Sequence, residues 1–228
     1  MTRVVELHYY PVKGCAGTSV RDAVVTPAGL THDRSFMITD KGGVFRSQRH
    51  DPRLALIHPE VAAEGERLTL RAPGAGTMCV DVELTAARRD VELFGVGYQG
   101  IDQGGAVARW LSQVLGTPSR LVRVPPEHDR VTDGETPGTS GYADSCPLLV
   151  TSRSSLDMLN ERIVERGGEP VPMNRFRPNI VVGGWDEPHR EDRARRINVG
   201  DAELGYAKLA IRCAVTTIDQ ESGTKEGP

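Results

Sequence analysis

The stretch Arg67-Leu68-Thr69-Leu70-Arg71 has apolar side chains at every second position, and Cys79-Val80-Asp81-Val82-Glu83-Leu84 repeats this alternation a few residues later. A period of two is typical of a strand with one buried face. Pro73-Gly74-Ala75-Gly76 lies between the two segments and supplies turn-forming residues. We therefore predict a β-hairpin here.

Further short strands are predicted on both sides of this hairpin. They cover residues 4–12, 35–39, 54–57, 180–182, 197–199 and 204–217. Strands this short and closely spaced are typical of barrels and sandwiches. The sequence therefore predicts a mainly β fold of the α+β class, with a few helices.

Two segments have helical periodicity. Residues 106–115 form the first, which ends at Gly116. The second covers residues 154–166, with Ser152 or Ser154 as its N-cap and a buried stripe formed by Leu156, Leu159 and Ile163. Between the helices, residues 125–141 are rich in Pro, Gly, Asp and Thr, and we expect a long loop that is mobile or lines a site.

Composition excludes several classes of protein. The chain has 228 residues, a net charge of −3, 38% hydrophobic and 26% charged residues, which is typical of a globular protein that binds no nucleic acid. It has no apolar run of the roughly 20 residues that cross a bilayer. Its four cysteines form no CxxC pair and no zinc-finger spacing. We expect a cytoplasmic protein with reduced thiols and no membrane contact.

Cationic and amide side chains recur in five short segments that suit an anionic ligand. They are Tyr10-Pro11-Val12-Lys13-Gly14-Cys15, His32-Asp33-Arg34-Ser35-Phe36, Arg46-Ser47-Gln48-Arg49, Thr151-Ser152-Arg153-Ser154-Ser155 and Asn174-Arg175-Phe176-Arg177-Pro178-Asn179. Arginine can clamp a phosphate through two hydrogen bonds, and a helix N-terminus favours anions. A solvated turn or a plain helix cap explains most of these segments equally well when each is taken alone.

Cys213 lies in Arg212-Cys213-Ala214-Val215-Thr216-Thr217-Ile218-Asp219. A thiol beside a cation is biased toward the thiolate, the form that binds metals. An isolated cysteine is more often a small buried hydrophobe. Together with the anion-binding segments, Cys213 favours a phosphorylated heterocycle that carries a soft metal, whereas the absence of a Walker loop and of a GxGxxG motif disfavours a nucleotide.

These segments resemble the MOSC family, and within it the mitochondrial amidoxime reducing components and their bacterial relatives. The resemblance follows the order of the family and covers nearly the whole chain. It rests on Tyr10-Pro11-Val12-Lys13, Asp33-Arg34, Gln48-Arg49 with Pro52-Arg53-Leu54, Ser155-Leu156 with Leu159-Asn160, Phe176-Arg177-Pro178-Asn179, and Arg212-Cys213 with Thr216-Thr217, Asp219 and Gly223. The last two segments are the specific ones.

The resemblance implies an N-terminal β-barrel subdomain, residues 1–95, packed on a MOSC β-barrel domain, residues 96–228. It also implies a molybdenum–pterin cofactor (Mo-molybdopterin) whose metal is bound by Cys213, with Asp219 as an acidic group that handles protons near the metal. The cofactor-binding residues that it implies are Lys13, Gly14, Arg34, Thr151, Ser152, Arg177, Asn179, Arg212 and Thr216.

Three departures from the family pattern matter. Gly14 stands where the mitochondrial members have a hydroxyl, so only its backbone could contact the ligand. No membrane anchor precedes Met1. The chain ends soon after Cys213, where relatives continue, so we expect either a truncated chain or a minimal form.

The sequence therefore predicts an oxidoreductase that reduces N-hydroxylated or otherwise N-oxygenated small molecules with electrons from a separate flavin, haem or iron–sulfur protein. One alternative is a carrier of sulfur or of the molybdenum cofactor without turnover of its own. A second is a module that binds a phosphorylated metabolite and performs no chemistry, with Cys213 as an inert thiol.

Overall fold

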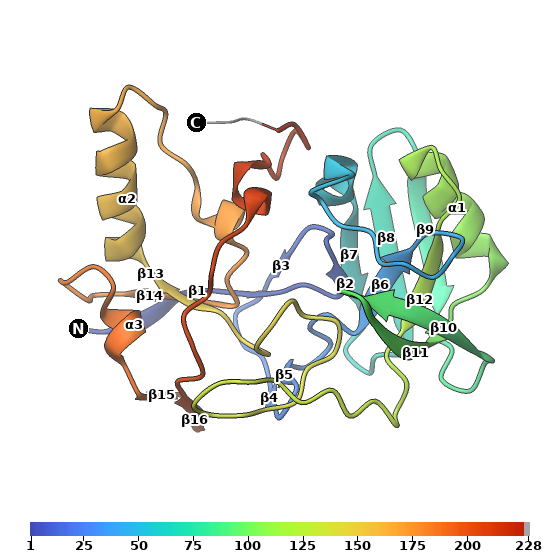
Figure 1. Cartoon of the computed structure of the whole chain (residues 1–228), viewed down its shortest axis with the longest axis horizontal. Coiled ribbons are helices and arrows are strands. Elements are labelled where there is room, and N and C mark those ends of the chain that lie inside the picture. The colour runs from blue at the N-terminus through green and yellow to red at the C-terminus, as the bar shows by residue number, and fades with distance from the viewer. Residues whose placement is uncertain (226–228) are drawn as a thin grey trace.

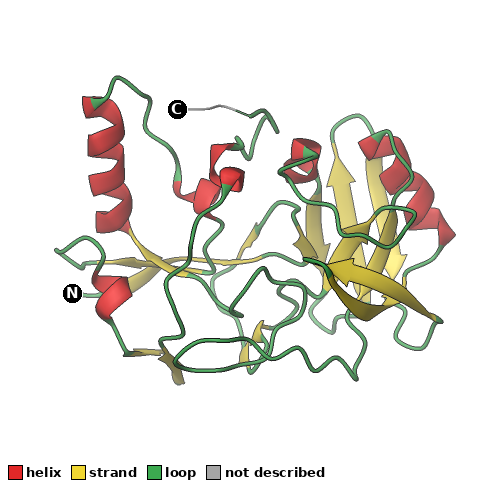
Figure 2. Cartoon of the chain, in the orientation of Figure 1, coloured by secondary structure: helices red, strands yellow, loops and turns green. Residues whose placement is uncertain are grey.

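The computed structural model describes residues 1–225; residues 226–228, at the end of the second predicted domain, lie outside the described residues. The chain is mainly β, as predicted, and its described strands form five sheets of two to five strands, none of which closes into a barrel. Figure 2 shows the strands in the middle of an elongated molecule, with the two long helices at opposite ends.

Two sheets and one helix make up the lobe at the right of Figure 1. The five-stranded sheet has the order β10 (Arg88–Leu93), β11 (Val96–Asp102), β12 (Arg120–Arg123), β6 (Phe36–Thr39) and β2 (Val12–Lys13). The three-stranded sheet contains β7 (His58–Val61), β8 (Arg67–Ala72) and β9 (Gly76–Asp81). The pairing of β8 with β9 confirms the predicted hairpin. Helix α1 (Gly105–Leu115) confirms the first predicted helix and ends at Gly116, which has a left-handed backbone.

The other lobe is built on a four-stranded sheet. Its order is β13 (Val150–Ser152), β14 (Ile180–Gly183), β1 (Arg3–Tyr9) and β3 (Thr18–Ser19). Helices α2 (Arg153–Glu165) and α3 (Arg190–Arg193) lie beside β13, and two small hairpins, β4 (Val25–Thr26) with β5 (Gly29–Leu30) and β15 (Arg196–Val199) with β16 (Ala202–Gly205), complete the strands.

The main hydrophobic core lies in the first lobe. Strand and helix residues such as Phe36, Leu68, Leu70 and Leu111 are almost fully buried there. By contrast, the predicted stripe of α2 is only half-buried, because α2 contacts just β13 and β14. The first lobe therefore has a well-buried core, whereas the second lobe is less buried.

Two predicted strands are wrong. Residues 54–57 belong to a 3₁₀ turn, Pro52–Leu56, because Pro52 at its start fixes a helical φ. Strand β16 ends at Gly205, and no strand among residues 1–225 pairs with the segment that follows it. That segment leads to a second 3₁₀ turn, Ala214–Thr217, preceded by Cys213.

Candidate functional site

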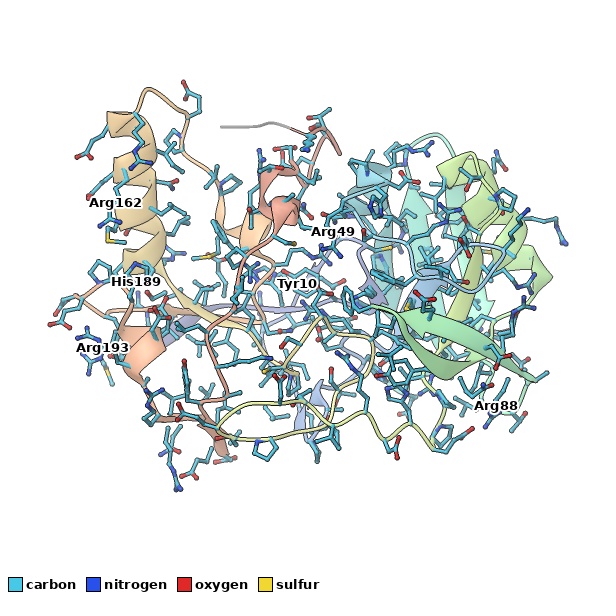
Figure 3. The ribbon with its side chains drawn as sticks, viewed as in Figure 1. Tyr10, Arg49, Arg88, Arg162, His189 and Arg193 are labelled. Carbon is cyan, nitrogen blue, oxygen red and sulfur yellow. The ribbon has the colours of Figure 1, made fainter. Side chains whose placement is uncertain are left out.

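The candidate site lies where the chain passes from one sheet to the other. Strand β1 ends at Tyr9 and β2 begins at Val12, so Tyr10 and Pro11 form the junction. Tyr10 lies near the middle of the molecule in Figure 3. Its backbone N–H donates to Asp33 Oδ1 at 2.8 Å and its hydroxyl donates to the Pro178 carbonyl at 3.2 Å. The junction thus joins segments from both ends of the chain.

The Tyr10 ring packs against two arginine side chains. The guanidinium carbons of Arg34 and Arg177 lie 4.2 and 4.4 Å from the ring centroid, distances typical of cation–π contacts. Burial raises the pKa of the Tyr10 hydroxyl, although both arginines act in the opposite direction. The Tyr10 ring therefore holds two planar cations within contact distance.

Both arginines have a left-handed backbone, with φ of 45° at Arg34 and 55° at Arg177. This conformation costs a non-glycine residue roughly 1–2 kcal/mol. Local hydrogen bonds hold it: the Arg34 N–H donates to the Tyr10 carbonyl at 2.7 Å, and the Arg177 N–H donates to the Asn174 carbonyl at 3.1 Å. Strain of this kind gathers at functional sites.

Asn179 and Asp33 hold the Arg34 guanidinium in place. Arg34 Nη1 donates to both Asp33 oxygens, at 2.8 and 2.6 Å, and to Asn179 Oδ1 at 3.0 Å. Asn179 Nδ2 donates in turn to Asp33 Oδ1 at 3.0 Å and to the His8 carbonyl at 3.2 Å. Asn179 is only 1% exposed, so the buried side of this network fixes the position of Arg34.

Lys13 supplies a third cation, next to these arginines. Its side chain is 6% exposed and its ammonium forms an ion pair with Asp144. Burial lowers the pKa of Lys13 to about 8, although Asp144 acts to raise it. Arg34 and Arg177 lie close enough that their charges also act on Asp144.

Asp144 lies among three cations. The protein atoms around its carboxylate would by themselves raise its pKa, but the charges of Lys13, Arg34 and Arg177 lower it. The Asp144 side chain is 69% exposed. We call the group formed by Lys13, Arg34, Arg177 and Asp144 the cationic cluster. Its chemistry suits a phosphate, which would compete with Asp144 for the same cations.

Arg212 connects Cys213 with the cationic cluster. Arg212 donates from Nη2 to the Phe176 carbonyl at 2.7 Å, and its charge interacts with Cys213, Asp144 and Arg34. Cys213 is exposed, and within residues 1–225 its Sγ has no hydrogen-bond partner. Its carbonyl accepts from the backbone and the hydroxyl of Thr216, at 3.2 and 3.1 Å, which fixes the backbone at the start of the 3₁₀ turn.

Two protein families match most of this chain. The MOSC N-terminal beta barrel domain family matches residues 1–118, and the MOSC domain family matches residues 137–228. The chain belongs to the MOSC family. The family resemblance read from the sequence motifs is therefore confirmed.

Named relatives of this MOSC protein fall into two groups. It is 33% identical to mitochondrial amidoxime reducing component 2 of Rattus norvegicus, over 96% of this chain and 68% of that protein. It is 32% identical to mitochondrial amidoxime-reducing component 1 of Homo sapiens, over 96% of this chain and 67% of that protein. Molybdenum cofactor sulfurase of Danio rerio is 29% identical over 97% of this chain but only 29% of its own length. These names associate the family with the molybdenum cofactor.

Asp219 has little freedom in this MOSC protein. Its Oδ2 accepts from Arg175 at 3.0 Å, while its Oδ1 accepts from the backbone N–H groups of Glu221 and Ser222 at 3.0 and 2.7 Å. These hydrogen bonds, with that to the Ser222 backbone the largest, lower the pKa of Asp219. The contacts favour a role in shaping the C-terminal turn, and the predicted proton transfer stays a prediction.

The hydroxyls of Thr151 and Ser152 have partners other than the three cations. Ser152 caps α2 by accepting from the Ser155 N–H at 3.2 Å, and its hydroxyl donates to Glu191 at 2.9 Å. The Thr151 hydroxyl contacts the Met173 sulfur at 3.4 Å. Among the described residues neither shares a hydrogen bond with Lys13, Arg34 or Arg177. The carboxylate of Glu191 occupies the start of α2 instead.

The backbone around Gly14 contributes to the site. Gly14 has φ of +80°, and its carbonyl accepts from Gln48 Nε2 at 2.7 Å. Gln48 and Gln220 form a reciprocal amide pair at 3.1 and 2.9 Å, and Gln220 Oε1 also accepts from Arg177 at 3.1 Å. Sequence reasoning missed Gln220 and Asp144. The only signal for Gln220 was its place next to Asp219, and the only signal for Asp144 was an acidic residue that follows the long loop.

Two cavities adjoin the described surface. One of about 290 Å³ is lined by Tyr10, Arg177, Pro178 and Gln220 among others, so it shares Tyr10 and Arg177 with the arginine stack. The larger, about 620 Å³, shares none of these residues, and two of its arginines, Arg193 and Arg196, are paired with carboxylates. We therefore place the candidate site at the cationic cluster, with the first cavity next to its Arg177.

Among residues 1–225, no group of three or more His, Cys, Asp or Glu side chains could bind a metal ion. No helix in the same residues combines the length and the apolar character needed to cross a membrane.

Proposed function

We propose that this MOSC protein binds a molybdenum–pterin cofactor and reduces N-hydroxylated or otherwise N-oxygenated small molecules, with electrons from a separate redox protein. The observation that carries the proposal is the gathering of Lys13, Arg34 and Arg177 around Asp144, near the exposed thiol of Cys213. The relatives named for amidoxime reduction support the substrate class.

The residues present fit such a cofactor. A thiolate is a soft ligand that suits a heavy transition metal, and the Cys213 Sγ is free to bind one. Lys13, Arg34 and Arg177 would bind the phosphate, while Asn179 and Asp33 hold Arg34 in place. Arg212 lies close enough to interact with Cys213. We include Gly14, through its backbone, and Thr216, through the turn that it closes, as supporting residues.

The cofactor, once bound, supplies the two-electron chemistry. Cleavage of an N–O bond takes two electrons and two protons and releases water. The electrons come from the redox partner, and the protons come from water, which reaches the exposed carboxylate of Asp144. We keep the cytoplasmic location and the two-domain division as predictions.

The metal and pterin content of the purified protein tests this proposal. Wild type, Cys213→Ala and Cys79→Ala would be made in a host that synthesises the cofactor. Cys79 is the matched control because it is also an exposed free cysteine. We expect near-stoichiometric molybdenum and pterin in wild type and Cys79→Ala, and loss of molybdenum in Cys213→Ala. Retention of metal and of N-reductase activity in Cys213→Ala would refute the proposal.

A carrier of sulfur or cofactor is the second candidate. The similarity to molybdenum cofactor sulfurase, over 97% of this chain, favours it, as does the exposure of Cys213. A persulfide on Cys213, detected by intact mass in a protein without N-reductase turnover, would support the carrier and exclude the reductase.

A further inference from the structure

A partly exposed aromatic side chain lies next to the cationic cluster. Phe94 lies at the tip of the hairpin formed by β10 and β11, and 43% of it is exposed. Its ring centroid is 4.8 Å from the Lys13 ammonium and 6.0 Å from the Arg49 guanidinium carbon. Phe94 therefore packs against Lys13 and leaves part of its surface open to solvent.

The residue that carries this ring has a strained backbone conformation. Leu93 pairs with Val96, so Phe94 and Gly95 form a two-residue turn, and both have positive φ, 55° and 79°. Turns of this kind prefer Asn-Gly or Gly-Gly, and a bulky residue at positive φ is an outlier. Local backbone preference therefore does not account for a phenylalanine at this position.

A second aromatic ring fixes the position of the first. The Phe45 and Phe94 centroids are 4.7 Å apart with an interplanar angle of 61°, an edge-to-face arrangement. Backbone hydrogen bonds tie the two segments together: the Phe45 N–H donates to the Glu92 carbonyl at 3.1 Å, and the Glu92 N–H donates to the Gly43 carbonyl at 2.9 Å. The two rings therefore form a rigid wall beside Lys13.

From this arrangement we infer that Phe94 determines substrate specificity by stacking on planar, π-conjugated N-hydroxylated compounds as they enter the site. The inference rests on the proposed function. It names Phe94 as a substrate-contacting residue and the flat aromatic compounds as the preferred members of the substrate class. Saturated compounds of the same size cannot stack on the exposed face of the ring, so they would bind less tightly.

The test compares two substrates of similar volume, an N-hydroxyamidine with a phenyl ring and one with a cyclohexyl ring. Reduction is followed with a chemical electron donor, reduced viologen, in wild type and in Phe94→Leu, Phe94→Asn and Phe94→Tyr. Phe94→Leu keeps the apolar bulk, Phe94→Tyr keeps the aromatic face, and Phe94→Asn removes the ring while relieving the strained turn.

We expect kcat/KM for the phenyl substrate, relative to the cyclohexyl substrate, to fall roughly three- to tenfold in Phe94→Leu and Phe94→Asn, because an aromatic pair contributes about 0.5–1.5 kcal/mol beyond its buried area. The change should lie in KM, and Phe94→Tyr should keep the wild-type ratio. Phe94→Asn should also melt at a higher temperature than Phe94→Leu, which separates the strain from the loss of selectivity.

The outcomes distinguish this inference from the proposed function. An unchanged substrate ratio in Phe94→Asn, in a wild-type protein that reduces both compounds, overturns the role of Phe94 alone. Loss of pterin from both Phe94→Leu and Phe94→Asn would make Phe94 a cofactor contact and would also overturn it. A molybdenum-loaded wild type that reduces neither compound refutes the proposed function, and this inference with it.

Discussion

Replacement of Asn179 by alanine is expected to destabilise the protein far more than its size suggests. Asn179 makes four hydrogen bonds: to the His8 carbonyl, to Asp33 Oδ1, from Arg34 Nη1 and from the Leu149 N–H, at 3.0–3.2 Å. It is 1% exposed, so water cannot replace them without rearrangement.

The magnitude follows from the partners. A neutral hydrogen bond contributes about 1 kcal/mol net, and one to a charged group about 1.5–3 kcal/mol. Two of the four partners of Asn179 are charged, but Arg34 and Asp33 still bind each other in the variant. We therefore expect Asn179→Ala to lower the free energy of unfolding by about 4 kcal/mol.

The matched control is Asn160→Ala. Asn160 is half-buried and makes two hydrogen bonds, at 3.0 and 2.9 Å, both to the Val171 backbone outside the site. Its loss should cost about 1–2 kcal/mol. Urea denaturation followed by circular dichroism measures both values, provided that the slope with urea is unchanged. If Asn179→Ala cost no more than Asn160→Ala, the reasoning about the buried network would be wrong.

Asn179→Asp gives an independent check by pH. One carboxylate oxygen would then face Asp33 Oδ1 at about the present 3.0 Å, where Asn179 now donates. Two carboxylates this close raise the pKa of one of them. A raised folded-state pKa stabilises at low pH, and this contribution is lost as the pH rises. The deficit of Asn179→Asp relative to wild type should therefore be smaller at pH 5 than at pH 8, and a pH-independent deficit would contradict this.

Two further predictions concern single ionisable groups. Because burial lowers the folded-state pKa of Lys13 to about 8, below its ordinary 10.5, the unfolded chain binds more protons between these values. The stability of wild type relative to Lys13→Met should therefore rise with pH over this range, by up to roughly 1.4 kcal/mol per pH unit in urea titrations; a flat difference would contradict the burial of a charged lysine. Because burial raises the pKa of the Cys15 thiol to about 12, iodoacetamide should label Cys213 and spare Cys15 in the native protein, as peptide mass mapping would show, and early labelling of Cys15 would refute its burial.

Local signals in the sequence predicted the regular elements well. The alternation in residues 67–84 encodes the hairpin of β8 and β9, because each strand buries one face. Helix α1 likewise follows from its apolar spacing. The segment 204–217 misled the prediction, since its apolar side chains include Ile211, which is 96% exposed. Apolar composition indicates a strand only where a neighbouring strand is present to pair with it.

The site was predictable as a set of residue types but not as an arrangement. Lys13, Arg34, Arg177 and Asn179 were named from the sequence, and the structure brings them together. The stacking of two arginines on Tyr10 requires positive φ at both, which no local propensity favours. Asp144 follows the long loop of residues 125–141, and the composition of this loop does not predict which of its neighbours reach the site. These features depend on contacts between residues more than a hundred positions apart.

That separation has a thermodynamic consequence. A single anion bound to Lys13, Arg34 and Arg177 would connect the N-terminal strands with β14 and its flanking turn, so the ligand would act as a cross-link between the two ends of the chain. By mass action, each tenfold excess of ligand over its dissociation constant adds roughly 1.4 kcal/mol to the stability of the folded state. Apparent melting temperature, resistance to proteolysis and cellular abundance should then all follow the supply of the ligand.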